Sequence, residues 1–70
     1  MKEFSIDGKE YIELNRVIKY ISWVESGGVA NSVIGDGQVK VNGVKEFRKR
    51  NKLRIGDVIK FDGKECKIIE

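Results

Sequence analysis

Residues 14–44, LNRVIKYISWVESGGVANSVIGDGQVKVNGV, decide the fold, because a helical pattern of apolar residues changes there into a strand pattern. Early in this stretch, apolar side chains recur at the i, i+3, i+4, i+7 spacing of one helix face: Leu14, Val17, Ile18 and Ile21. This spacing predicts an amphipathic helix. We expect Trp23 and Val24 to close its far end.

A second helix is predicted directly after the first. Ser26 is a typical N-cap residue, followed by Gly27 and Gly28. The next residues place apolar side chains at helical positions: Val29, Ala30, Val33 and Ile34. Gly35 and Gly37 end this run, and one of them is expected to adopt the left-handed conformation that terminates helices.

The residues beyond the helix pair show the alternation of strands. Val39 and Val41 alternate with polar residues, and Asn42-Gly43 predicts a hairpin turn from which Val44 begins the return strand. Further strands are predicted between glycine-containing turns, over Lys52–Ile55, Val58–Phe61 and Glu65–Ile69.

The N-terminus suggests one more hairpin, with Glu3–Ile6 and Lys9–Ile12 joined by an Asp7-Gly8 turn. The order is then two strands, two helices and several strands. We therefore predict an α+β fold in which two short helices pack on a small antiparallel sheet, as one domain over residues 1–70.

Composition excludes several classes of function. The 70 residues contain no histidine and one cysteine, so a zinc site is not expected and a Ser-His or Cys-His nucleophile pair cannot form. The chain also lacks an apolar run long enough to span a membrane and an N-terminal signal peptide. We expect a cytoplasmic monomer that is not an enzyme and uses neither a cofactor nor a small-molecule substrate.

The strongest functional indication is the distribution of charge. Lys45–Arg54 holds six cations and the single carboxylate of Glu46, a formal charge of +5, which leaves −2 for the other sixty residues of a chain with net charge +3. The cations are Lys45, Arg48, Lys49, Arg50, Lys52 and Arg54. Phosphate backbones are the usual partners of such segments. A solvated loop and a docking site for an acidic protein remain the alternatives.

Other candidate residues carry a weaker indication. Glycines after Ser26 could expose backbone N–H groups to an anion at the start of the second helix, although an ordinary capped turn is by itself the better explanation. Trp23, Tyr20 and Phe47 could stack on bases, although Trp23 and Tyr20 are expected instead to be core or helix-packing residues. Cys66 is expected to be buried and inert. Asp57 and Asp62 fit turn positions rather than acid–base chemistry.

Three features together resemble a known family: the helix pair joined through Ser26-Gly27-Gly28, the hairpin Val39-Lys40-Val41-Asn42-Gly43, and the basic stretch Arg48-Lys49-Arg50-Asn51-Lys52. They resemble the alpha-L RNA-binding domain of the small-subunit ribosomal protein four type. The whole chain is similar to the short, free-standing bacterial YbcJ-like proteins.

This resemblance implies binding of structured RNA, such as ribosomal RNA, transfer RNA or the ribosome itself. It also leaves open a role as the accessory domain of an RNA-modifying enzyme. The implied RNA-binding positions are Ser26, Gly27, Gly28, Asn31, Lys40, Asn42, Lys45, Arg48, Lys49, Arg50 and Lys52. Asn31 departs from the family pattern, because relatives commonly carry a basic residue there, and this leaves most of the positive charge on the hairpin side.

Overall fold

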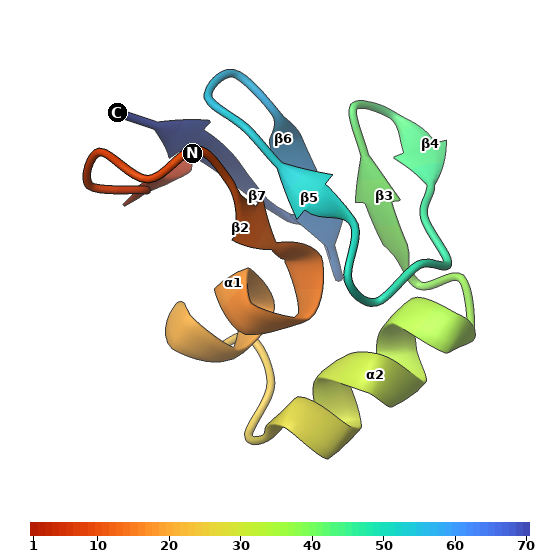
Figure 1. The fold of residues 1–70 in the computed structure, drawn as a ribbon. Coiled ribbons are helices and arrows are strands. Elements are labelled where there is room, and N and C mark those ends of the chain that lie inside the picture. Colours follow the sequence, from red (N-terminus) through yellow and green to blue (C-terminus); the bar gives the residue numbers. More distant parts are fainter.

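A computed structural model describes residues 1–70 as two helices and seven strands (Figure 1). In chain order they are β1 (Lys2–Ser5), β2 (Ile12–Glu13), α1 (Leu14–Tyr20), α2 (Gly27–Gly35), β3 (Val39–Val41), β4 (Val44–Lys45), β5 (Lys52–Leu53), β6 (Val58–Phe61) and β7 (Lys64–Ile69). Five strands form one sheet in the order β1-β7-β6-β3-β4, and β2 pairs with β5 in a separate two-stranded ribbon. The predicted α+β class, with a helix pair and a small sheet, is confirmed.

Two tight turns build the antiparallel part of the sheet. Asn42 and Gly43 have φ values of 52° and 84°, and Asp62 and Gly63 have values of 52° and 74°. Positive φ at both central residues is the geometry of a type I′ turn, whose twist matches that of the flanking strands. These turns join β3 to β4 and β6 to β7. The hairpin predicted at Asn42-Gly43 is thus confirmed.

The predicted N-terminal hairpin is wrong. β1 runs parallel to β7, with Phe4 opposite Ile68, whereas β2 pairs with β5 through Ile12 opposite Leu53. The sheet is therefore mixed rather than purely antiparallel. Asp7 and Gly8 do form a turn, at φ values of 51° and 79°. The chain leaves that turn in another direction, because Phe4 gains apolar neighbours beside Ile68 that the polar Lys9-Glu10 segment could not offer.

The first helix is shorter than its apolar spacing suggests. α1 ends at Tyr20, and Ser22 adopts a φ of 62°, which no continuing helix permits. Trp23 and Val24 consequently lie in the connection between the helices rather than in α1. Both still pack where expected: Val24 is buried, and the half-buried Trp23 lies against the core.

The second helix begins and ends as predicted. The Ser26 hydroxyl oxygen accepts a hydrogen bond from the Val29 N–H at 3.2 Å, which satisfies one of the unpaired donors of the first turn. At the other end, Gly37 has a φ of 75°, and its N–H donates to the Ile34 carbonyl at 3.0 Å.

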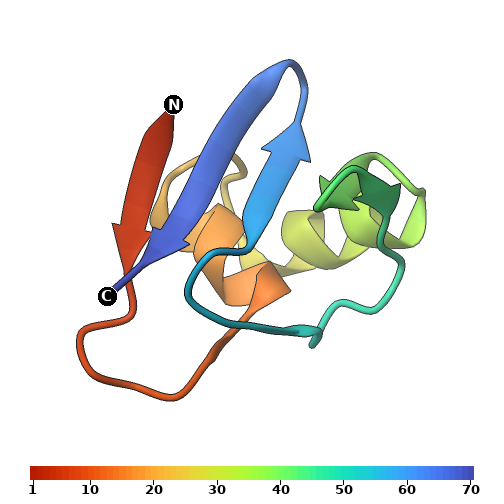
Figure 2. The same cartoon turned by 90° about the horizontal axis from the view of Figure 1, so that it is seen from above.

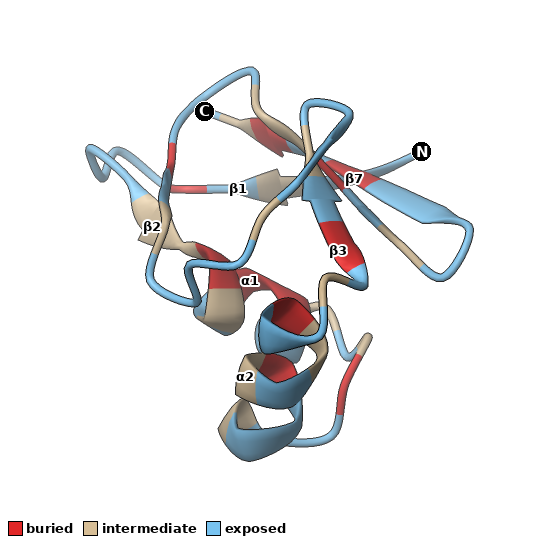
Figure 3. Cartoon of the chain, turned by 90° about the vertical axis from the view of Figure 1, so that its right-hand side faces the viewer, coloured by how far each residue is buried: buried red, intermediate tan, exposed pale blue.

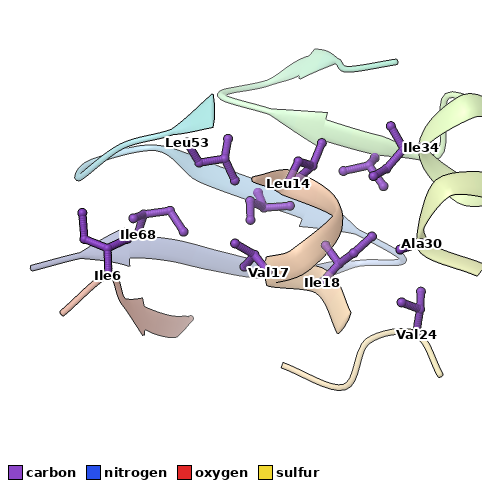
Figure 4. Close-up of a cluster of buried hydrophobic side chains, with 11 residues drawn as sticks. Ile6, Leu14, Val17, Ile18, Val24, Ala30, Ile34, Leu53 and Ile68 are labelled. Carbon is purple, nitrogen blue, oxygen red and sulfur yellow. The ribbon is translucent and has the colours of Figure 1, made fainter. Parts of the chain in front are cut away.

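The core lies between the helix pair and one face of the sheet (Figures 2 and 4). α1 contributes Leu14, Val17 and Ile18, and the stick view shows these side chains gathered against the strands. Buried positions of α1, α2 and β3 turn toward this space, whereas the connecting loops are largely exposed (Figure 3). Strand β5 adds Leu53 to the core, but Ile55 lies beyond the strand and is 56% exposed, so the predicted strand over Lys52–Ile55 is too long.

Candidate functional site

The basic segment is fixed to the start of α1 through its backbone. Glu13, the N-cap residue of α1, makes no side-chain capping bond. Instead, the Leu14 N–H donates to the Asn51 carbonyl and the Asn15 N–H to the Lys49 carbonyl, both at 3.0 Å. Two donors that a helix N-terminus leaves unpaired are thereby satisfied. The loop after β4 is anchored by uncharged groups, so its cationic side chains are not needed for this attachment.

Four of these cations surround one hollow of about 390 Å³. No hydrophobic side chain lines it; the lining residues are Arg48, Arg50, Asn51, Lys52 and Arg54. We call this site the basic hollow. Because guanidinium groups bind phosphate in a planar, two-pronged manner, three arginines and one lysine around a shallow depression suit a phosphate group.

Arg48 also has a structural contact. Its Nε and Nη2 donate to the two carboxylate oxygens of Glu46 at 3.0 and 3.1 Å, and its backbone N–H donates to the same carboxylate at 2.9 Å. The Arg48 guanidinium holds the pKa of Glu46 below its usual value, and the carboxylate raises the pKa of Arg48. Arg48 therefore shapes the loop, although its side chain stays 76% exposed.

The other cations of the segment are less engaged. Lys52 Nζ lies 4.9 Å from the centre of the Tyr11 ring, and Arg54 Nη2 is 4.0 Å from Glu10 Oε1. Lys49 and Arg50 are exposed and form no ion pair. Since exposed contacts of this kind are worth little, most of the positive charge remains available to a ligand.

Hydrogen bonds of the Asn42 and Asp57 side chains link the β3–β4 hairpin to the start of β6. Asn42 Nδ2 donates to Asp57 Oδ1 at 3.0 Å, and Asn42 Oδ1 accepts from the Val58 N–H at 2.9 Å. Asp57 Oδ2 accepts from the Arg54 N–H at 2.8 Å. The amide of Asn42 is thus used within the protein. Asp57 holds a turn, as its sequence context predicted.

The predicted positions on α2 meet the loop through a pair of asparagines. Asn15 Nδ2 donates to Asn31 Oδ1 at 3.1 Å, and Asn15 is the residue whose N–H binds the Lys49 carbonyl. Gly27 and Asn31 are one helical turn apart and share a face of α2. Neither Gly27 nor Gly28 would bring an added Cβ closer than 3.8 Å to another group, so this face is open. α2 itself carries no charged residue.

Lys40 and Lys45 lie elsewhere, on the sheet. They are direct partners in β3 and β4, and Lys40 is also the partner of Lys60 in β6. All three are exposed, and they alternate with the core-facing Val39 and Ile59. A row of three lysines therefore crosses the sheet face that the helices leave uncovered. Like charges directly opposite each other are unfavourable, so this row also favours a polyanionic ligand.

The remaining candidates divide between core and surface. Tyr20 is 55% exposed, so it is not a core residue; its ring, at the end of α1, stacks on Phe4 of β1 at a centroid distance of 6.2 Å. Phe47 is also exposed, and its ring lies over Gly37. Cys66 is fully buried, and burial raises the pKa of its thiol, as expected of an inert cysteine.

Sequence patterns did not indicate two residues of this surface, Lys60 and Asn15. Arg54 was counted among the cations of the basic segment, and it lines the basic hollow while its backbone N–H donates to Asp57. Lys60 joins Lys40 through strand register, which the alternation in each strand does not reveal. Asn15 looked like an ordinary exposed helix residue, and no pattern indicated its contacts with Asn31 and Lys49.

Residues 4–69 match the model of the S4 domain family. The chain is 38% identical over 69 residues to the Escherichia coli protein named "Putative RNA-binding protein YbcJ", covering 99% of both chains. It is 36% identical over 59 residues to the Bacillus subtilis "Probable ribosome maturation protein RlbA", covering 84% of this chain and 82% of the relative.

Solved structures agree with the family match. The solution structure of Escherichia coli YbcJ, described as having an alpha-L motif involved in RNA binding, superposes with a TM-score of 0.77 at 37% identity, over 100% of this chain and 89% of that one. Ribosomal protein S4e from Thermoplasma acidophilum shares the fold, with a TM-score of 0.67 at 24% identity over 81% of this chain and 30% of its own. The resemblance found in the helix pair, the hairpin and the basic stretch is confirmed, and the chain belongs to the S4 domain family.

Proposed function

We propose that this protein binds structured RNA through the basic hollow and the adjoining open face of α2. The observation that carries the proposal is the basic hollow itself, where four cations surround a depression that no hydrophobic residue lines. The names of its YbcJ and RlbA relatives support RNA and the ribosome as the kind of target. Ser26, Gly27, Gly28 and Asn31 would border the RNA on the helix side.

Recognition would depend mainly on shape and phosphate positions. Double-stranded RNA offers side chains its phosphates and 2′-hydroxyls more readily than its base edges. The groups around the basic hollow suit this target, because Arg and Lys side chains contact phosphates without reading sequence. Lys40, Lys45 and Lys60 on the sheet would attract a more distant part of the same polyanion.

The proposed role is binding without catalysis, by a monomer in the cytoplasm. The chain supplies no histidine, and no three His, Cys, Asp or Glu side chains gather where they could hold a metal ion. Neither helix is long and apolar enough to cross a membrane. Ribosomal RNA or the assembling ribosome is the target that the relatives favour.

A salt titration with a fully paired RNA hairpin tests the proposal. If the four cations of the basic hollow each neutralise one phosphate, the logarithm of the association constant falls with log[salt] at a slope of about −3.6. Affinity would then drop about a hundredfold between about 50 and 200 mM salt. A flat line, or equal competition by an acidic polypeptide, would favour protein docking instead.

A pair of matched variants locates the surface. The double change Lys49→Gln and Arg50→Gln removes one cation beside the basic hollow and one within it. Loss of the Arg50 contact should make the salt slope shallower by about 0.9. The control variant, Lys2→Gln with Lys67→Gln, changes the net charge by the same amount. Its two positions are on β1 and β7, at the end of the sheet opposite to β3 and β4. An equal loss of affinity in both pairs would show that the surface is wrongly assigned.

A further inference from the structure

A second hollow, of about 420 Å³, lies between the segment before β2 and the helix α1. Tyr11 precedes β2, Ile12 and Glu13 form β2, and Tyr20 ends α1. Arg16 and Tyr20 are four residues apart in α1 and share one helix face, which Glu13 extends as the N-cap residue. We call this site the tyrosine groove. Its size is in the range of small-ligand sites.

Both tyrosine rings in the groove are partly open to solvent, Tyr11 at 37% and Tyr20 at 55% exposure. Each ring nevertheless has a neighbour within the protein. The Tyr20 ring is stacked on Phe4 with an interplanar angle of 16°, and Lys52 Nζ lies 4.9 Å from the centre of the Tyr11 ring. Partly exposed aromatic rings are the groups on which proteins stack unpaired bases.

The charges around the tyrosine groove differ from those around the basic hollow. Two cations, Lys9 and Arg16, are balanced by two carboxylates, Glu10 and Glu13, and Arg16 Nε donates to Glu13 at 3.1 Å. A phosphate would gain little from this balanced set. A neutral heteroaromatic ring suits it better, because carboxylates and arginine can bind the donors and acceptors at its edge.

The two sites lie on opposite edges of one strand ribbon. Ile12 and Glu13 of β2 pair with Leu53 and Lys52 of β5. Lys52 lines the basic hollow and also lies over the Tyr11 ring of the tyrosine groove. An RNA strand whose phosphate is bound beside Lys52 in the basic hollow would therefore also lie beside the Tyr11 ring of the tyrosine groove.

We propose that the tyrosine groove binds one unpaired nucleobase of the RNA whose phosphates occupy the basic hollow. This inference rests on the proposed function and adds specificity to it. The protein would then prefer RNA in which a bulge or a single-stranded end adjoins a duplex. Since stacking on one aromatic side chain typically changes affinity about tenfold or more, the preference should be of that size.

Two RNA hairpins that differ only by one bulged 2-aminopurine nucleotide test the inference. For the unmodified protein, the bulged hairpin should bind about tenfold more tightly than the paired one, with quenching of 2-aminopurine fluorescence as the base stacks. Tyr20→Leu should bring the affinity ratio close to one. Tyr20→Phe keeps the ring and should keep the ratio. Phe47→Leu removes an equally exposed ring that lies outside the groove and should also keep it.

The outcomes separate the inference from the proposed function. If both hairpins bind with equal affinity and the fluorescence does not change, the tyrosine groove takes no base, but RNA binding stands. If Tyr20→Leu weakens both hairpins equally, the ring only supports the fold, and the inference is again wrong. If neither hairpin binds at any salt concentration, the proposed function itself fails. Circular dichroism of each variant confirms that it is folded.

Discussion

Replacing Asn42 with glycine should destabilise the protein far more than the equivalent change at Asp62. The two residues occupy the same position of two type I′ turns, each with a φ of 52° and a glycine after it. Only Asn42 uses its side chain, which binds Asp57 and the Val58 N–H. Because glycine accepts positive φ without strain, each change removes a side chain without disturbing its turn.

The size of the effect follows from the two hydrogen bonds. A bond to a carboxylate contributes about 1.5–3 kcal/mol and a neutral one about 0.5–1.5 kcal/mol. Both bonds of Asn42 are exposed to solvent, so we take the low ends and expect a loss of about 2 kcal/mol for Asn42→Gly. A chain of 70 residues has a total free energy of unfolding of about 3.5–10 kcal/mol, so this loss is a large share.

Thermal unfolding followed by circular dichroism measures the difference. A loss of about 2 kcal/mol lowers the Tm of a domain of this size by about 8–16 °C. Glycine also raises the conformational entropy of the unfolded chain, which lowers the free energy of unfolding by about 0.4–1 kcal/mol. This effect is common to Asn42→Gly and Asp62→Gly and cancels when the two variants are compared. Equal Tm values for the two variants would refute the reasoning, because they would show that the Asn42–Asp57 link contributes nothing to stability.

Two further predictions concern Gly37 and Cys66. Gly37→Ala should lower the Tm, because the φ of Gly37 is 75° and an added Cβ would lie 2.9 Å from the Phe47 ring. Gly35→Ala, at the open end of α2, should be neutral or stabilising by up to about 1 kcal/mol. A comparable fall in Tm for both variants would contradict this prediction. Burial raises the pKa of the Cys66 thiol, so the folded state holds this proton more tightly than the unfolded state does. The contribution of this proton to the free energy of unfolding is complete below the ordinary pKa of 9.0 and is lost as the pH rises toward the raised pKa of the folded state. Urea titrations from about pH 8 to pH 10 should therefore show a steeper loss for the unmodified protein than for Cys66→Val, and a thiol reagent should label Cys66 only as the protein unfolds.

The sequence predicted those elements whose cause is local. The i, i+3, i+4, i+7 spacing placed α1, the Ser26 hydroxyl capped α2, and Asn42-Gly43 formed its turn, because each depends on residues within a few positions of one another. The N-terminal strand was mispaired for the opposite reason. Its partner is β7 at the other end of the chain, and the alternation within β1 does not indicate which strand will bury Phe4.

The candidate site shows the same division. The concentration of cations was visible in composition, and the structure does gather Arg48, Arg50 and Lys52 around one hollow. The contact between Arg48 and Glu46 was not predictable, since their spacing in an irregular loop does not fix how the side chains are directed. The row formed by Lys40 and Lys60 depends on register between strands twenty residues apart, which no local pattern reveals.

A segment of charge +5 can be ordered in so small a protein because neutral groups hold it in place. The Lys49 and Asn51 carbonyls cap α1, and the Glu46 N–H donates to the Val39 carbonyl at 3.0 Å. Electrostatic repulsion among the exposed cations is screened by water and salt, so it costs little. Phosphate-binding side chains other than Arg48, which also binds Glu46, can then be changed without removing the contacts that position the loop. Loss of RNA affinity in Lys49→Gln with Arg50→Gln should therefore occur without loss of stability, whereas Asn42→Gly should reduce stability first and weaken binding only as the position of Arg54 is lost.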